Sequence, residues 1–291
     1  MRPVRKHPSP LATGEGAIGL SGCLCNPVCR ISHKIDSLEK LNGLTMLENT
    51  RIVLVNTSHP GNIGAAARAM KNMGLSRLYL VNPKEHPTFE SFSRAAGADD
   101  VLGNAVITDS LADALKGCVW VAGTSARERM VQWPIYQPRE CAAICRDQSL
   151  QGDIAIVFGR ERSGLTNEEL EMCNGLVNIP TSPEYSSLNV AAAVQVLCYE
   201  LRLAFLSHAD TVVEKTRTSR EDMPATTDQL EGMYQHMYQM MQDIQFFSGS
   251  NPEVIMRRLK SLFNRAQTTK REVAILRGIF SAAQGGKRRR M

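Results

Sequence analysis

The stretch that most constrains the fold is residues 179–197, IPTSPEYSSLNVAAAVQVL, where a short apolar strand gives way to a long apolar helix. Pro180 ends the strand, and the helix is expected to begin at about Leu188 after a turn-rich loop. Free backbone N–H groups at a helix N-terminus can hold a polar or anionic ligand. Small polar side chains lie beside them, namely Ser182, Ser186, Ser187 and Asn189. Such residues also serve as plain helix caps, so this loop alone does not define a site.

Two further loops have a similar composition. Residues 56–64 (NTSHPGNIG) follow a predicted strand at 51–55, and residues 159–166 (GRERSGLT) follow one at 154–158. Loops that leave the C-terminal ends of strands in an open α/β sheet meet at one ligand crevice. We therefore expect all three loops to share a pocket.

Residues 46–207 alternate short β-rich runs with helical periodicity. Further strands are predicted at 77–81, 105–108 and 119–122, and residues 123–137 are expected to form a long loop that faces the substrate. This alternation predicts a parallel sheet covered by helices on both faces. The chain, at 291 residues, has room for this domain and a smaller one.

A polar linker is expected at residues 208–227, followed by a small helical domain at 228–284 and a basic tail at 285–291. Apolar residues at helical spacing predict its core, with methionines inside rather than on a binding surface. They are Leu230, Met233, Met237, Met240, Met241, Ile244, Ile255, Leu259, Leu262, Ala266, Val273, Leu276 and Phe280. Residues 251–291 hold 11 Lys and Arg against 2 Asp and Glu, which favours either a surface that contacts phosphate or a solvated helix face.

Residues 1–45 are rich in Pro, Gly and Ser and are predicted to be disordered. We hypothesise that translation begins at Met46, which an intact-mass measurement of the native protein tests.

The composition also argues against membrane and metal sites. No apolar run is expected to approach the roughly 18 residues of a membrane span. The chain has eight cysteines, and those of the main domain fall in apolar stretches, as in the core of a reduced cytosolic protein. No pair of His or Cys completes a zinc set, so no metal is expected. Because no apolar run is expected to be long enough to span a membrane, no membrane partner is expected either.

Three ordered motifs resemble those of the SPOUT superfamily of knotted RNA methyltransferases. They are NTSHPGNIGAAARAM, VFGRERSGLTNEE and IPTSPEYSSLNVAAAVQV, and the resemblance spans about residues 46–206. Within the superfamily they are most similar to bacterial members that methylate the ribose 2′-oxygen of cytidine or uridine at position 32 of the tRNA anticodon loop. The resemblance implies an α/β fold with a deep trefoil knot, S-adenosyl-L-methionine as cofactor, tRNA as partner, a homodimer and a cytoplasmic location.

The resemblance also assigns residues. The positions that match the cofactor-lining residues of the family are Thr124, Ser125, Ala126, Gly159, Ile179, Ser186, Ser187 and Leu188. Arg68 matches the arginine proposed to act on the 2′-hydroxyl, and Ser187 and Asn189 are further catalytic candidates. Because a guanidinium stays protonated in proteins, we expect Arg68 to orient the ribose or stabilise the developing alkoxide. In such homodimers Arg68 of one subunit faces the cofactor of the other.

Candidates for binding RNA come from charge and motif position. They are Asn62, which would alternatively cap its helix, then Arg127, Arg129 and Arg162, and on the C-terminal helices Arg257, Arg258, Lys260 and Arg265. Trp133 and Tyr136 are candidates to stack a base. Glu161, between two arginines, is expected either in an internal ion pair or in the chemistry.

Two alternatives stay open. One is a 2′-O-methyltransferase for another tRNA or rRNA site. The other is a non-catalytic RNA-binding protein on the same scaffold, which titration with S-adenosylmethionine tests.

Overall fold

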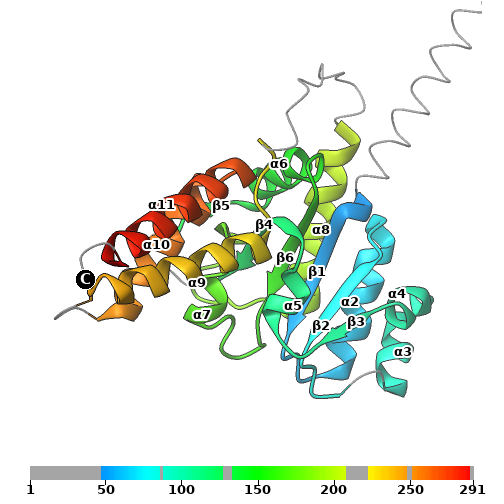
Figure 1. Cartoon of the computed structure of the whole chain (residues 1–291). Coiled ribbons are helices and arrows are strands. Elements are labelled where there is room, and N and C mark those ends of the chain that lie inside the picture. The colour runs from blue at the N-terminus through cyan, green and yellow to red at the C-terminus, as the bar shows by residue number, and fades with distance from the viewer. Residues whose placement is uncertain (1–46, 86–87, 127–132, 208–221, 248–250, 289–291) are drawn as a thin grey trace, which may run out of the picture.

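The structure is a computed structural model, shown in Figure 1, and describes residues 47–85, 88–126, 133–207, 222–247 and 251–288. The expected leader, residues 208–221 of the expected linker, and the candidates Arg127 and Arg129 lie outside these ranges.

Seven parallel strands form one sheet in the order β3-β2-β1-β6-β4-β7-β5. The predicted parallel sheet is thus confirmed, although β5 lies in the stretch expected to be a loop. The strands are β1 (Thr50–Val55), β2 (Arg77–Val81), β3 (Val106–Thr108), β4 (Cys118–Thr124), β5 (Ile135–Tyr136), β6 (Asp153–Phe158) and β7 (Gly175–Val177).

Helices cover both faces of this sheet. Side chains of α2, α6 and α8 form one buried cluster with the strands, and those of α5 and the α7 region form another. Successive residues of β1 alternate between the two clusters: Ile52 and Leu54 lie in the first, and Val53 and Val55 in the second. This period of two explains why the central strands are apolar throughout. The helical elements are η1 (Leu47–Asn49), α2 (Pro60–Met73), α3 (Phe89–Ala95), α4 (Asp99–Gly103), α5 (Leu111–Leu115), α6 (Pro138–Ser149), α7 (Asn167–Leu170) and α8 (Val190–Ser207).

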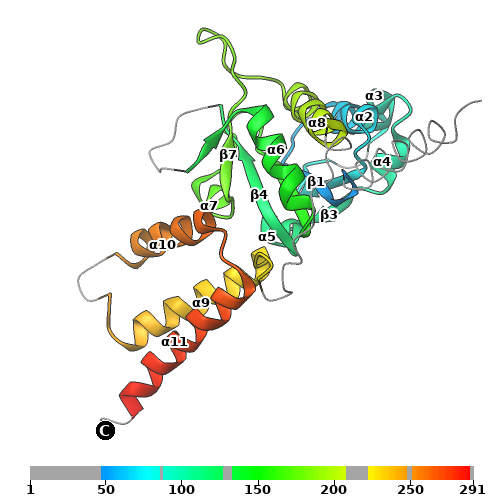
Figure 2. The same ribbon diagram turned by 90° about the horizontal axis from the view of Figure 1, so that it is seen from above.

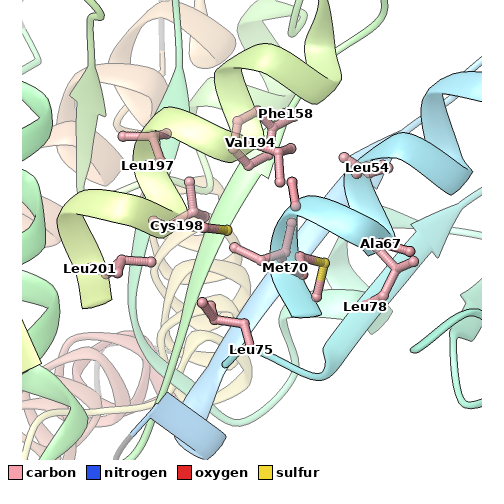
Figure 3. Close-up of a cluster of buried hydrophobic side chains, with 14 of the residues drawn as sticks. Leu54, Ala67, Met70, Leu75, Leu78, Phe158, Val194, Leu197, Cys198 and Leu201 are labelled. Atoms are coloured by element: carbon pink, nitrogen blue, oxygen red, sulfur yellow. The ribbon is translucent and has the colours of Figure 1, made fainter. Parts of the chain in front are cut away.

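The helix α8 corrects one expectation. By length and composition alone its 18 residues are long and apolar enough to cross a membrane, contrary to the expectation that no apolar run approaches the length of a membrane span. One side packs onto α2 and the sheet, where Val194, Leu197 and Leu201 are buried (Figure 3). Arg202 also donates to the carbonyl oxygen of Met73 at the end of α2 (3.1 Å).

Three helices follow: α9 (Thr227–Asp243), α10 (Pro252–Ala266) and α11 (Lys270–Arg288). Both views place them at one end of the molecule, with α3 and α4 at the other (Figures 1 and 2). Their core contains Met233, Met237 and Met240, as the spacing predicted. Ile244, Leu262 and Ala266, expected in that core, are exposed instead. Ile244 lies at the C-cap of α9 and Ala266 is the last residue of α10, so both lie where their helices end.

At the edge where the strands begin, two arginines and one aspartate form a network of ion pairs and hydrogen bonds. Arg51 is only 8% exposed and donates twice to Oδ2 of Asp153 (3.1 and 2.5 Å) and to the carbonyl oxygens of Ala114 and Lys116 (2.8 and 2.9 Å). Arg77 donates to both oxygens of the same carboxylate, each at 2.8 Å. Burial alone would raise the pKa of Asp153, but the hydrogen bonds from Arg77 and Arg51 outweigh it, and the pKa is lowered. The network joins β1, β2 and β6 away from the candidate site.

Candidate active site

One cavity at the edge where the strands end is lined by all eight residues expected to contact the cofactor. They follow β4, β6 and β7, which are neighbours in the sheet, so the three loops leave it side by side. The residues are Thr124, Ser125, Ala126, Gly159, Ile179, Ser186, Ser187 and Leu188.

The loop after β6 is a tight turn that folds back on Gly159. Arg160 and Gly164 exchange backbone hydrogen bonds (3.2 and 2.9 Å). A Cβ atom at Gly159 would lie 2.2 Å from the carbonyl carbon of Gly164 and 2.3 Å from the nitrogen of Leu165. Close backbone approach therefore requires glycine here whether or not a ligand is bound. Glu169 accepts two hydrogen bonds from Arg160 (2.9 and 3.0 Å), so the guanidinium of this cavity-lining arginine is already paired.

The loop after β4 is fixed by its neighbour β7. Asn178 donates from Nδ2 to the carbonyl oxygen of Ser125 (2.8 Å), and the Ser125 N–H donates to Val177 (3.1 Å). Apolar side chains of Ile179 and Leu188 line the cavity beside small residues that leave backbone donors and acceptors within reach. A slot with apolar walls and backbone polar groups suits a purine ring, so these residues fit S-adenosylmethionine.

None of residues 56–64 lines this cavity, so the expectation that the loop after β1 shares the pocket is wrong. Glu161, which does line the cavity, connects it to that loop. Its carboxylate accepts hydrogen bonds from the N–H and Oγ of Ser58 (3.1 and 3.0 Å), the N–H of His59 (3.3 Å) and Nδ2 of Asn62 (3.1 Å). Burial alone would raise the pKa of Glu161, but backbone hydrogen bonds and those from Asn62 and Ser58 outweigh it and lower the pKa. Within the described part of the chain Glu161 makes no ion pair, so its expected internal ion pair is wrong and hydrogen bonds take its place.

Asn62 and Asn189 join the first and third motifs directly. Nδ2 of Asn189 donates to Oδ1 of Asn62 (2.9 Å), and Oδ1 of Asn189 accepts from the N–H of Ala191 in the first turn of α8 (2.9 Å). Asn189 thus caps α8. The residue that caps α2 is His59, and Asn62 lies inside the first turn, so the capping role expected of Asn62 is wrong because the helix begins two residues earlier, at Pro60.

Arg68 lies on the outer side of α2, where it is exposed. It is not among the residues that line the cavity of its own protomer. Ser187, in contrast, is exposed at the cavity itself. One chain therefore brings the three motifs together but leaves Arg68 outside the cavity.

Two of the RNA candidates in the sheet domain differ in exposure. Arg162 is exposed and lines the cavity. Trp133, in contrast, is 6% exposed and belongs to the buried cluster that contains α5. The expectation that Trp133 stacks a base is therefore wrong, because the β5 strand that follows it carries it into the core.

The RNA candidates on the C-terminal helices divide into side chains with a partner and side chains that are exposed. Arg257 pairs with Glu171 at the end of α7 and is thus partly neutralised. Lys260 lies 3.4 Å from Glu231 and over the ring of Tyr234. Arg258 and Arg265 are exposed on α10.

Two asparagines that the sequence did not single out join α10 to the sheet. Asn174, before β7, accepts from the N–H of Val121 in β4 (2.8 Å) and donates to the carbonyl oxygen of Asn264 (3.0 Å). The side chain of Asn264, whose residue is 5% exposed, donates to the carbonyl oxygen of Glu171 (2.8 Å) and accepts from the hydroxyl of Tyr234 (2.8 Å). We call this group the asparagine joint. No periodicity or motif marks either asparagine, so only the fold identifies them.

Candidate metal ligands do not gather anywhere in the described ranges, where no group of three His, Cys, Asp or Glu is found. The described cysteines are all free and buried: Cys118, Cys141, Cys145, Cys173 and Cys198. Burial raises the pKa of Cys118 and of Cys173, each to about 12, so these thiols stay protonated core residues.

Two family models match the chain. Residues 49–199 match the SpoU rRNA Methylase family, and residues 228–291 match the C-terminal domain of the tRNA methyltransferase TrmJ. The two matches correspond to the sheet domain and to the three C-terminal helices.

Similar proteins extend over most of the chain. The tRNA (cytidine/uridine-2′-O-)-methyltransferase TrmJ of Photorhabdus laumondii is 50% identical over 239 residues, which is 82% of this chain and 98% of that protein. The tRNA (cytidine/uridine/adenosine-2′-O-)-methyltransferase TrmJ of Pseudomonas aeruginosa is 48% identical, over 82% and 95%. The crystal structure of TrmJ from Z. mobilis has a TM-score of 0.69 at 32% identity, covering 80% of this chain and 98% of that one.

Proposed function

Because the chain belongs to the SpoU rRNA Methylase family, we propose that it transfers the methyl group of S-adenosylmethionine to a ribose 2′-oxygen of tRNA. The observation that carries this proposal is the single cavity lined by residues of three separate loops. The C-terminal match and the similar tRNA enzymes favour tRNA over rRNA. Cytidine and uridine are the acceptors we propose, at position 32 of the anticodon loop, as the resemblance of the motifs implies.

The cavity residues would hold the cofactor. Ile179 and Leu188 would supply apolar contact to the adenine, and backbone groups near Ser125 and Gly159 would bind its polar edge. S-adenosylmethionine supplies a methyl group already activated by its sulfonium. The chain must therefore hold the acceptor oxygen in line and assist loss of its proton.

Arg68 acts as an electrostatic residue and not as a base, since its guanidinium stays protonated. It donates hydrogen bonds to the oxygen on which negative charge develops. Ser187, exposed at the cavity, orients the ribose. Asn189 caps α8 and holds Asn62, so it positions the first motif against the third.

The active form is proposed to be a homodimer in which Arg68 reaches the cavity of the partner subunit. Two observations support this: Arg68 lies outside its own cavity, and α8 exposes Tyr199 and Leu203 on the side away from the sheet. Large apolar side chains aligned on one helix face suit an interface between copies. The location we propose is cytoplasmic, which the free, buried cysteines support.

Complementation between subunits tests the shared site. We expect Arg68→Ala protein and Leu188→Asp protein, the latter with a charge in the apolar wall of the cavity, to be inactive alone. Their mixture, after exchange of subunits, should regain up to about a quarter of the wild-type activity. Light scattering should give the mass of a dimer for both variants. A mixture that stays inactive although the dimers exchange would contradict catalysis between subunits.

Methylation of purified tRNA tests the function itself. The protein is incubated with tRNA and cofactor labelled in the methyl group, and the digested RNA is analysed by mass spectrometry. We expect the label on a ribose, in an anticodon-loop fragment that contains position 32. Label at another site would support the alternative methyltransferase, whereas cofactor binding without transfer to any RNA would contradict the reaction.

A further inference from the structure

An exposed aromatic side chain stands next to the cofactor cavity and has no role in the core. Tyr185 lies in the loop between β7 and α8 and is 82% exposed. The residues that follow it, Ser186 and Ser187, line the cavity. Its side chain has no hydrogen-bonding or ring partner within the described residues. An aromatic ring left in water beside a site is more informative than a buried one, because its apolar surface is not used for folding.

The loop holds Tyr185 in a defined position although the ring itself is free. The N–H of Tyr185 donates to the carbonyl oxygen of Ser182 (3.0 Å), and Oγ1 of Thr181 donates to the carbonyl oxygen of Ser186 (3.1 Å). These bonds close the loop on both sides of the tyrosine. Two residues span at most about 7 Å, so the Tyr185 backbone cannot be farther than that from Ser187. The backbone that carries the ring is therefore already positioned beside the cavity.

We propose that Tyr185 stacks on the base of the nucleotide whose ribose is methylated. This inference rests on the proposed function. The bases of a single-stranded RNA loop can be splayed out, and proteins stabilise such unstacked bases on aromatic rings. A nucleotide whose ribose enters the cavity would bring its base beside Tyr185. Stacking does not read the edge of the base. That property suits enzymes such as the similar ones above, whose names include both cytidine and uridine as acceptors.

Other exposed rings fit this role less well. Phe89 is 91% exposed but lies at the start of α3, follows a different strand, and does not line the cavity. Tyr199 is exposed in the third turn of α8 and belongs to the proposed dimer surface. Phe89 therefore offers a control: an equally exposed ring in the same domain whose removal leaves the cavity unchanged.

The test compares Tyr185→Ala with Tyr185→Phe and with the control Phe89→Ala, each as the full chain. For Tyr185→Ala we expect the KM for tRNA to rise about 10- to 100-fold, the range that removing one stacking ring from a nucleic-acid site produces. The Kd for S-adenosylmethionine, measured by calorimetry, should stay within about twofold of wild type. Tyr185→Phe should retain a wild-type KM because stacking needs the ring and not the hydroxyl, and Phe89→Ala should change the KM by less than about twofold.

A fluorescent base gives a readout that a purely structural role would not move. An anticodon stem-loop carrying pyrrolo-cytidine at the methylated position should lose fluorescence on binding wild type or Tyr185→Phe, because stacking quenches it, and should keep it with Tyr185→Ala at saturating protein. Unchanged quenching with Tyr185→Ala overturns the proposal, as does a variant that becomes monomeric in light scattering, since Tyr185 would then be a subunit contact. If the wild-type protein methylates no RNA, the proposed function fails; if it methylates RNA and Tyr185→Ala does so equally well, only this inference fails.

Discussion

At the edge where the strands begin, Arg51 and Arg77 share the carboxylate of Asp153, whereas near the cavity Arg162 is exposed and has no acidic partner among the described residues. Arg68, on the outer side of α2, is equally free in that part of the structure. Removing the partner of a buried guanidinium is destabilising because the charge is then left uncompensated. An exposed, unpaired one is available to RNA. The same residue type thus serves the fold at one edge and the substrate at the other, and substitutions at the two edges should separate these effects.

The largest effect is expected for Arg68→Ala. We predict that kcat falls about 10²- to 10³-fold, because a donor to developing negative charge is lost. The free energy of unfolding should change by less than about 0.5 kcal/mol, as for other exposed positions, and the cofactor Kd should be unchanged. Arg68→Lys should recover only part of the rate, since an ammonium lacks the planar fork of the guanidinium. A wild-type kcat for Arg68→Ala removes this residue from the mechanism.

Asp153→Ala should reduce the stability of the protein and leave its activity unchanged. Its removal leaves two guanidinium groups without their carboxylate, so urea denaturation should show a loss of about 3 kcal/mol. The activity per folded molecule should stay near wild type. Asp109→Ala, an exposed carboxylate before α5, is the matched control and should cost less than about 0.5 kcal/mol.

The pH dependence gives a second check on Asp153. Its pKa is lowered in the folded protein, so its contribution to stability is complete above the ordinary aspartate pKa of about 4 and is lost as the pH falls through the lower folded-state value. The difference in unfolding free energy between wild type and Asp153→Ala should therefore stay constant from pH 7 to about pH 5 and shrink as the pH falls below about 4. A difference that grows on acidification would contradict the charge network.

Glu161 lies on the side of the cavity and should have an intermediate effect. Glu161→Gln removes the negative charge that accepts from Ser58, His59 and Asn62 and replaces one acceptor oxygen with a donor. We expect the unfolding free energy to fall by about 1.5 kcal/mol and kcat/KM by about tenfold, because the first motif loses its anchor. Equal kcat/KM values would show that the first loop is held by other contacts.

The smallest effect is expected for Arg162→Ala. An exposed arginine that contacts a phosphate should weaken tRNA binding only severalfold, and the slope of log K against log salt should fall by about one. Filter binding at several salt concentrations measures both. Arg146→Ala, which removes an arginine paired with Asp147 on α6, should leave the slope unchanged.

The sequence predicted most of what local pattern and motif position determine. The alternation of strands and helices, the methionine core and the shared cavity of Gly159, Ile179 and Ser187 follow from period, composition and resemblance. Tertiary context decided the rest. Trp133 is buried by a two-residue strand too short to show a period, and Glu161 meets neutral groups of a loop about 100 residues earlier. The trefoil knot and the roles of the site residues stay predictions.

The asparagine joint has a consequence for how this enzyme could be re-engineered. Asn174 contacts β4 three residues before Thr124 and, through Asn264, the helix that presents Arg258 and Arg265. The two amides therefore help to fix the distance between the cofactor cavity and α10, together with the Arg257–Glu171 pair and the hydrogen bond from Thr227 to the carbonyl oxygen of Leu115. A chimera that takes its last three helices from a relative should place those helices on tRNA as the relative does only if Asn174 and Asn264 are both replaced with the relative's residues.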